Sequence, residues 1–135
     1  MRSGSIALSA LLLGISFICS CDSSMPVSGS ELPGLYVIQS GSVTDSIRLE
    51  PNGRFEHHLW DDSGLAISEI GTWTRSHYPD GDFAVDFSGI SPFADRSAPH
   101  VSHPGFWLTR VGRTRNGQVT LMLNRDLNLV YSRKD

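Results

Sequence analysis

Ile47–Trp73 reads Ile-Arg-Leu-Glu-Pro-Asn-Gly-Arg-Phe-Glu-His-His-Leu-Trp-Asp-Asp-Ser-Gly-Leu-Ala-Ile-Ser-Glu-Ile-Gly-Thr-Trp. This stretch decides the fold because apolar and polar residues alternate in it. Ile47 and Leu49 take one face of a first run, and the polar side chains beside them take the other. A period of two residues is typical of a half-buried β-strand. Pro51-Asn52-Gly53 then supplies a turn, since proline presets φ and Asn-Gly tolerates positive φ. The stretch therefore predicts antiparallel strands joined by tight turns.

A second alternating run follows that turn and places Phe55, His57 and Leu59 on one face. After the next turn, Asp61–Gly64, a longer run carries Gly71 in its interior, where glycine often marks a β-bulge. We therefore expect the third strand of this stretch to bulge at Gly71.

The same alternation of short strands and turn residues extends to both sides. The expected strands are Leu35–Gln39, Val43–Glu50, Arg54–Trp60, Leu65–Arg75, Asp82–Phe87, Gly105–Val111, Gln118–Leu123 and Leu129–Arg133. Ser88–Pro104 carries three prolines and is expected to form a long loop. No window has the apolar spacing of a helix. The sequence predicts an all-β fold: an antiparallel meander of seven or eight strands closed as a small barrel, with a β-sandwich as the alternative. We favour the barrel because closure removes exposed strand edges.

The N-terminal segment carries targeting information. Arg2 is the only charge before Asp22, and the apolar run Ile6–Ile18 is too short to span a bilayer, so the segment indicates a secretory signal. Its end, Ile18-Cys19-Ser20-Cys21, resembles the lipobox of bacterial lipoproteins. The resemblance implies cleavage after Ser20 and lipidation of Cys21, which would anchor the protein to a membrane. The alternative is an ordinary secreted protein cut nearby.

These features divide the chain into a cleaved signal peptide (1–20), a lipidated cysteine with a flexible tether (21–33) and a barrel domain (34–135). Cleavage removes one of the 11 Lys and Arg residues, so ten face 14 Asp and Glu, and a mildly acidic domain gives no reason to expect nucleic acid as a partner. With Cys21 lipidated, no thiol remains for a disulfide, a nucleophile or a metal. The expected location is the bacterial cell envelope, at the periplasmic or outer face of the cytoplasmic membrane, with the outer membrane as the other destination.

A second resemblance covers residues 35–75. Ile47–Phe55 followed by Gly71-Thr72-Trp73 is similar to a theme of small bacterial envelope lipoproteins with a lipocalin-like β-meander domain. That group includes the N-terminal domain of copper-homeostasis lipoproteins, which carry a Cys-x-x-Cys that this chain lacks. A thiol-based copper or redox role is therefore not expected.

Histidines are the first candidates for chemistry. His57 and His58 are adjacent on a strand and point to opposite faces, so they cannot share a metal ion. His100 and His103 are the metal candidates on the long loop; the further ligand would be His77 or Asp95. Because a site needs three or four converging ligands, we interpret these histidines as surface residues and expect no metal and no cofactor. The chain has no Gly-x-Ser-x-Gly and no His-Glu-x-x-His, so we do not expect an enzyme.

Aromatic side chains are the candidates for contact with a ligand or partner, namely Trp60, Trp107 and, in the long loop, Phe93. Two functions stay open. The first is an interaction module that binds or inhibits an envelope protein, with 88–104 as the contact loop because long loops are often functional. The second is a lipocalin-like carrier of a small apolar ligand. Small barrels are either packed or hollow, and we favour a packed one.

Overall fold

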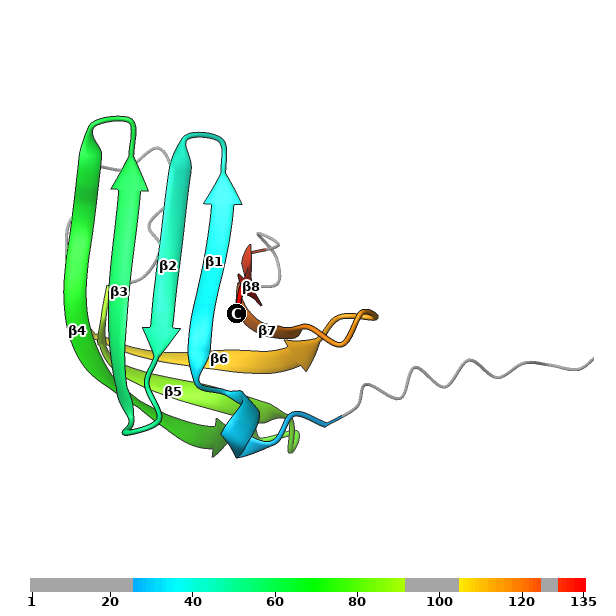
Figure 1. Cartoon of the computed structure of the whole chain (residues 1–135). Coiled ribbons are helices and arrows are strands. Elements are labelled where there is room, and N and C mark those ends of the chain that lie inside the picture. The colour runs from blue at the N-terminus through cyan, green and yellow to red at the C-terminus, as the bar shows by residue number, and fades with distance from the viewer. Residues whose placement is uncertain (1–25, 92–104, 125–128) are drawn as a thin grey trace, which may run out of the picture.

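Eight antiparallel strands follow one another in chain order and close into a barrel (Figure 1). The structure is a computed structural model that describes residues 26–91, 105–124 and 129–135. The strands are β1 (Gly34–Ser40), β2 (Val43–Leu49), β3 (Arg54–Asp61), β4 (Gly64–His77), β5 (Phe83–Ile90), β6 (Gly105–Arg113), β7 (Val119–Asn124) and β8 (Leu129–Arg133). The all-β class, the meander and the barrel rather than the sandwich are confirmed, and the fold matches a small lipocalin-like barrel.

The barrel closes where the first strand meets the last. β1 pairs with β8 through Tyr36↔Arg133 and Val37↔Ser132. Because the strands alternate in direction, β1, β3, β5 and β7 all finish at one end, which we call the upper end. The described segment before β1, the C-terminus and the turns after β2, β4 and β6 lie at the other end, the base (Figure 1).

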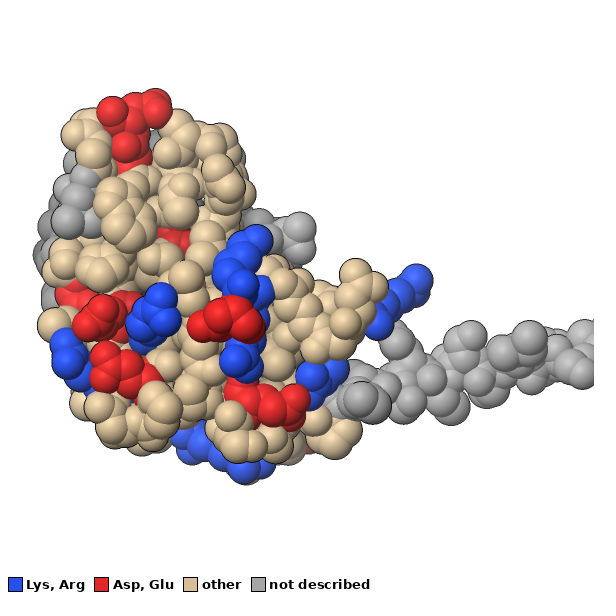
Figure 2. Space-filling model, viewed as in Figure 1, with Lys and Arg blue, Asp and Glu red and all other residues tan. Residues whose placement is uncertain are grey.

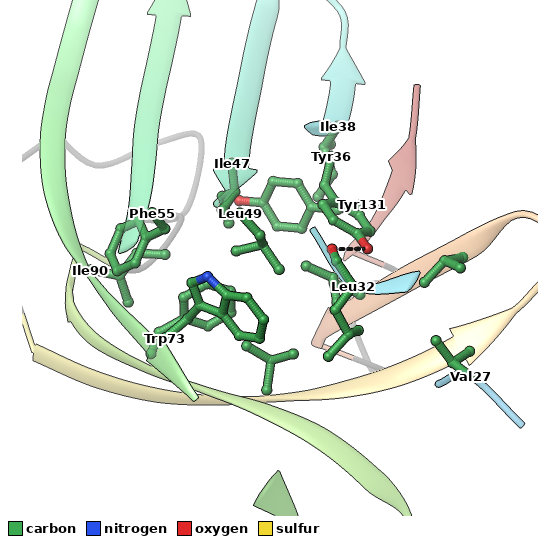
Figure 3. Packing of buried hydrophobic residues seen from close by; sticks show 14 of the residues in the cluster. Val27, Leu32, Tyr36, Ile38, Ile47, Leu49, Phe55, Trp73, Ile90 and Tyr131 are labelled. Atoms are coloured by element: carbon green, nitrogen blue, oxygen red, sulfur yellow. Dashed lines mark hydrogen bonds between the residues drawn. The ribbon is translucent and has the colours of Figure 1, made fainter. Parts of the chain in front are cut away.

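The lower part of the barrel is filled by side chains that alternate inward along the strands. Phe55 and Phe87 meet edge to face with their ring centroids 5.3 Å apart. Large side chains with almost no exposed surface belong to the same cluster: Tyr36, Ile47, Leu49, Val85, Ile90, Leu121 and Tyr131. Figure 3 shows several of these residues pointing into a common interior. The described core is therefore packed in the manner of a protein interior.

The base is closed by the segment that precedes β1. Residues Gly29–Glu31 form a 3₁₀ turn, and Leu32 beyond it is fully buried. The Tyr36 hydroxyl donates to the Leu32 carbonyl at 2.8 Å (Figure 3), and Arg113 pairs with the Glu31 carboxylate at 2.8 Å. We expected a free tether up to Pro33 from its polar composition. The described part of that segment instead packs on the barrel, because the barrel mouth gives its two apolar residues, Val27 and Leu32, a place to be buried.

The Gly-Thr-Trp theme has a structural reason. Trp73 closes the turn between β2 and β3: its backbone N–H donates to the Gly53 carbonyl at 2.8 Å and its indole N–H donates to the Glu50 carbonyl at 3.0 Å. The tryptophan therefore holds the Asn-Gly turn against β4, which links the two halves of the theme in space.

Two local expectations were wrong. The register between β3 and β4 is continuous at Gly71, which faces Phe55, and shifts instead at Leu59/Trp60. A Cβ at Gly71 would lie 2.3 Å from the Ser88 carbonyl oxygen and 2.5 Å from the Phe55 ring, so glycine serves close packing there and marks no bulge. The long loop does not start at Ser88 either, because β5 continues to Ile90 through a register shift.

Candidate functional site

The barrel interior contains a row of ionisable side chains from three adjacent strands. His57 on β3 lies between two carboxylates: its Nε2 is 2.8 Å from Asp45 Oδ1 on β2, and its Nδ1 is 2.7 Å from Glu69 Oε1 on β4. Asp45 and His57 are 0% and 1% exposed, and Glu69 is 10% exposed. Such burial is rare for charged groups unless they are paired.

The row continues to the residue after β5. The Ser91 backbone N–H donates to Glu69 Oε1 at 2.5 Å, and its hydroxyl donates to Glu69 Oε2 at 2.8 Å. We call Asp45, His57, Glu69 and Ser91 the interior chain. It connects β2, β3, β4 and the end of β5 near the upper end of the barrel.

The alternation of side chains along each strand and the pairing register between the strands produce this arrangement. Asp45 shares the inward face of β2 with Ile47 and Leu49, and His57 lies between Phe55 and Leu59 on β3. The pairing then sets His57 directly opposite Glu69 on β4. Directly opposite residues on neighbouring strands lie close enough for their side chains to interact.

The environment of His57 favours its charged form. Burial by itself lowers the pKa of His57, but the hydrogen bonds and negative charges of Asp45 and Glu69 outweigh it and raise the pKa above 6.5. Two carboxylates on the two ring nitrogens also require both nitrogens to donate, which only the imidazolium does.

Two buried oxygens in the described part of the barrel have no hydrogen-bond partner: Asp45 Oδ2 and Thr109 Oγ1. Tyr131 lies near the same carboxylate, and burial first, then the charge of Asp45, raises the pKa of Tyr131 well above 10. Its phenol stays protonated at every ordinary pH. Within the described residues, no three His, Cys, Asp or Glu side chains are arranged to hold a metal ion. The interior chain can hold and release a proton, but solvent does not reach its buried members.

The accessible site lies on the other side of the same strands. An outer groove of about 440 Å³ crosses β1, β2 and β3 and is lined by Leu35, Val37, Thr44, Ser46, Arg48, Glu56, His58 and Trp60. In Figure 2, viewed as in Figure 1, an almost uncharged surface covers these strands between the acidic tip of the β3–β4 hairpin and a band of mixed charge below. The groove therefore lies on a weakly charged part of the surface, and most of its lining area is apolar.

Its walls are fixed by neighbouring contacts. Trp60 is 39% exposed and lies against His58, with ring centroids 5.3 Å apart. At the lower edge, Arg48 reaches the Asp135 carboxylate at 4.0 Å, and Glu56 pairs with Arg54 at 3.2 Å. Because the charged side chains at this edge are paired, the groove offers a partner mainly aromatic and aliphatic surface.

The predicted contact and metal-ligand residues lie in different parts of the structure. Trp60 lies in the outer groove, whereas Trp107 faces inward and packs, partly buried, against the core. His57 and His58 point to opposite faces of β3, as predicted. His77 lies edge-on to Phe83 with ring centroids 5.8 Å apart. The other candidates lie outside the described residues: Cys21, Phe93, Asp95, His100 and His103.

No protein-family model, no curated protein and no solved structure matches this chain. Within the described residues, no helix has the length and apolar character needed to cross a bilayer.

Sequence reasoning missed both. For the interior chain the signal was present, since Asp45 and Glu69 occupy inward positions of alternating strands. The partners of His57 lie 12 residues away in each direction along the chain, so they are found only when the inward faces are extended across the sheet. The outer groove has no comparable signal, because it forms from two or three residues on each of three strands.

Proposed function

We propose that this protein is a membrane-anchored, non-enzymatic interaction module of the bacterial cell envelope that binds a partner protein through the outer groove. The observation that carries the proposal is the groove itself: a mainly apolar depression that contains a half-exposed tryptophan and lies on a part of the surface with few charges. Tryptophan is among the residues most enriched at the energetic centres of protein interfaces.

Packing of the barrel favours this function over a carrier. The described inward side chains fill the lower barrel, and Leu32 closes the base. A carrier of a small apolar ligand needs a cavity of roughly 300 Å³ or more. The occupant we infer is an extended, mainly apolar segment of the partner, because the charged edge of the groove is already ion-paired.

The anchor is the lipid on Cys21, inferred from the lipobox resemblance. One acyl chain binds membranes only marginally, and two or more anchor stably. Labelling cells with radioactive palmitate tests it: the wild-type chain takes up label and a Cys21→Ser variant does not. Equal labelling of both variants would rule out this anchor.

Partner binding is tested by site-specific photo-crosslinking in the native host. A photoreactive phenylalanine replaces His58 in the groove, and in a matched control it replaces Phe106, which is 86% exposed on β6. We expect a single crosslinked product from position 58 and none of that mass from position 106. Loss of a central tryptophan costs about 2 kcal/mol or more, roughly thirtyfold in affinity. Adding Trp60→Ala should therefore remove the product, while Phe106→Ala should leave it.

Two results would refute the groove as the binding site. One is the same product from positions 58 and 106, which means nonspecific collision. The other is a product from position 58 that Trp60→Ala leaves unchanged in yield.

A further inference from the structure

We propose that the interior chain is a proton-operated latch: while His57 carries both ring protons it ties β2, β3, β4 and the end of β5 together, and when it loses one the tie to Glu69 opens. The proposal is independent of the outer groove and of the anchor. It rests on the distances and burial of four residues inside the barrel.

The geometry permits two discrete states. Both ring nitrogens of His57 lie within 2.8 Å of a carboxyl oxygen, so each contact needs a hydrogen between its two atoms, and with both carboxyl groups ionised that hydrogen is on the nitrogen. Neutral imidazole has only one N–H. Its bare nitrogen would then place a lone pair against a carboxylate oxygen with no hydrogen between them, and that contact must open.

The two carboxylates differ in their burial and in the hydrogen bonds that they accept from groups other than His57. Asp45 is fully buried and its Oδ2 already lacks a partner, whereas Glu69 is 10% exposed and receives two further bonds from Ser91. A buried acceptor without a donor costs about 1–3 kcal/mol. Neutral His57 therefore keeps its proton on Nε2 toward Asp45, and the contact that opens is Nδ1 to Glu69.

Opening the contact between His57 and Glu69 also weakens the hydrogen bond from the Ser91 N–H. Glu69 Oε1 accepts from both His57 Nδ1 and the Ser91 backbone N–H. When the carboxylate moves away from the bare nitrogen, the bond from the Ser91 N–H lengthens. The protonation state of a side chain on β3 is thereby transmitted to the end of β5.

Tyr131, the other titratable group that faces the interior chain, does not change its charge in the pH range where His57 titrates. Tyr131 on β8 lies near Asp45 and senses the charges of Asp45 and Glu69, but its phenol stays protonated because burial raises its pKa well above 10. His58, next in sequence, points to the outer face and supplies a matched control.

The test is a pH titration of the full chain, ¹⁵N-labelled and held in mild detergent, followed by NMR. Long-range proton–nitrogen spectra should show both nitrogens of His57 protonated at pH 6. At high pH only Nε2 should keep its proton. The Ser91 amide proton should shift upfield with the same midpoint, and His58→Gln should change neither curve.

A second variant separates a latch from simple packing. In Glu69→Gln the side chain loses its negative charge, which is one of the causes that raise the pKa of His57. We expect the midpoint of the His57 titration to fall to lower pH and the midpoint of the Ser91 amide shift to fall with it, because both groups share the same acceptor oxygen. Three results would overturn the proposal: a singly protonated His57 at pH 6, a proton left on Nδ1 at high pH, or a wild-type Ser91 amide that ignores the His57 titration.

Discussion

Replacing Gly71 by alanine should destabilise the barrel strongly, although it adds one methyl group. The new Cβ would lie 2.3 Å from the Ser88 carbonyl oxygen and 2.5 Å from the Phe55 ring, closer than real Cβ contacts come. The ring is held edge to face against Phe87, and the carbonyl belongs to β5. Neither neighbour is the loose end of a flexible side chain, so the sheet must shift.

The size of the loss follows from the two contacts. Overpacking a well-packed core costs about 1–3 kcal/mol, and here a ring and a backbone are displaced together, so we expect about 3 kcal/mol or more. Gly117 is the control, because its φ is 83° but a Cβ there meets nothing within 4 Å. Gly117→Ala should cost only the backbone strain, about 1–2 kcal/mol.

Urea unfolding of both variants measures the difference. Gly71→Ala should lower the midpoint well below that of Gly117→Ala with an unchanged slope. Combining Gly71→Ala with Phe55→Leu should recover only the part due to the ring, because the Ser88 carbonyl remains. If Gly71→Ala is no worse than Gly117→Ala, close packing is not the reason for glycine at this position.

Three further predictions concern the base and the interior chain. Leu32→Ala should cost about 3–5 kcal/mol in urea unfolding, since it empties a fully buried site; a loss below 1 kcal/mol would mean that the segment does not close the base. Because the pKa of His57 is raised in the folded state, the stability that it gives is complete below pH 6.5 and is lost as pH rises through the folded pKa. The urea midpoint should therefore fall as pH rises through that range. The fall should be smaller in His57→Gln and as large as in the wild type in His58→Gln. The hydrogen bond from Arg113 lowers the pKa of Glu31 to about 2, so its contribution is present above pH 4.5 and lost toward pH 2; Glu31→Gln should remove that part of the acid dependence, and an identical acid curve would contradict the pairing.

The fold was readable because each strand carries its own period-two pattern and is bounded by turn residues. Leu129–Arg133 was predicted with its observed bounds, whereas β4 runs on to His77 and β5 to Ile90. Those extensions depend on pairing with neighbouring strands, which a single strand does not reveal. The base closure was missed for a related reason: Leu32 is one apolar residue in a polar segment, and its burial depends on an opening that exists only after the barrel has closed.

The sites were less readable than the fold. Alternation alone assigns Asp45, His57 and Glu69 to inward faces, but their contacts require the register between β2, β3 and β4. That register depends on turn geometry, where a slip of one residue reverses every face. Trp60 was named as a contact candidate from its type. The depression beside it could not be inferred, since β1 and β2 contribute most of its lining.

The contact between the start of β1 and the C-terminus at the base has a mechanical consequence. The Leu35 N–H donates to the Asp135 carboxylate at 3.0 Å, and the Lys134 N–H donates to the Leu35 carbonyl at 2.8 Å, beside a seam of two residue pairs between β1 and β8. A pull on the N-terminal segment, such as a membrane tether would transmit, reaches this short seam and Leu32 before any longer strand pair. The barrel would yield by unzipping from β1, while β3, β4 and β5 are strained last.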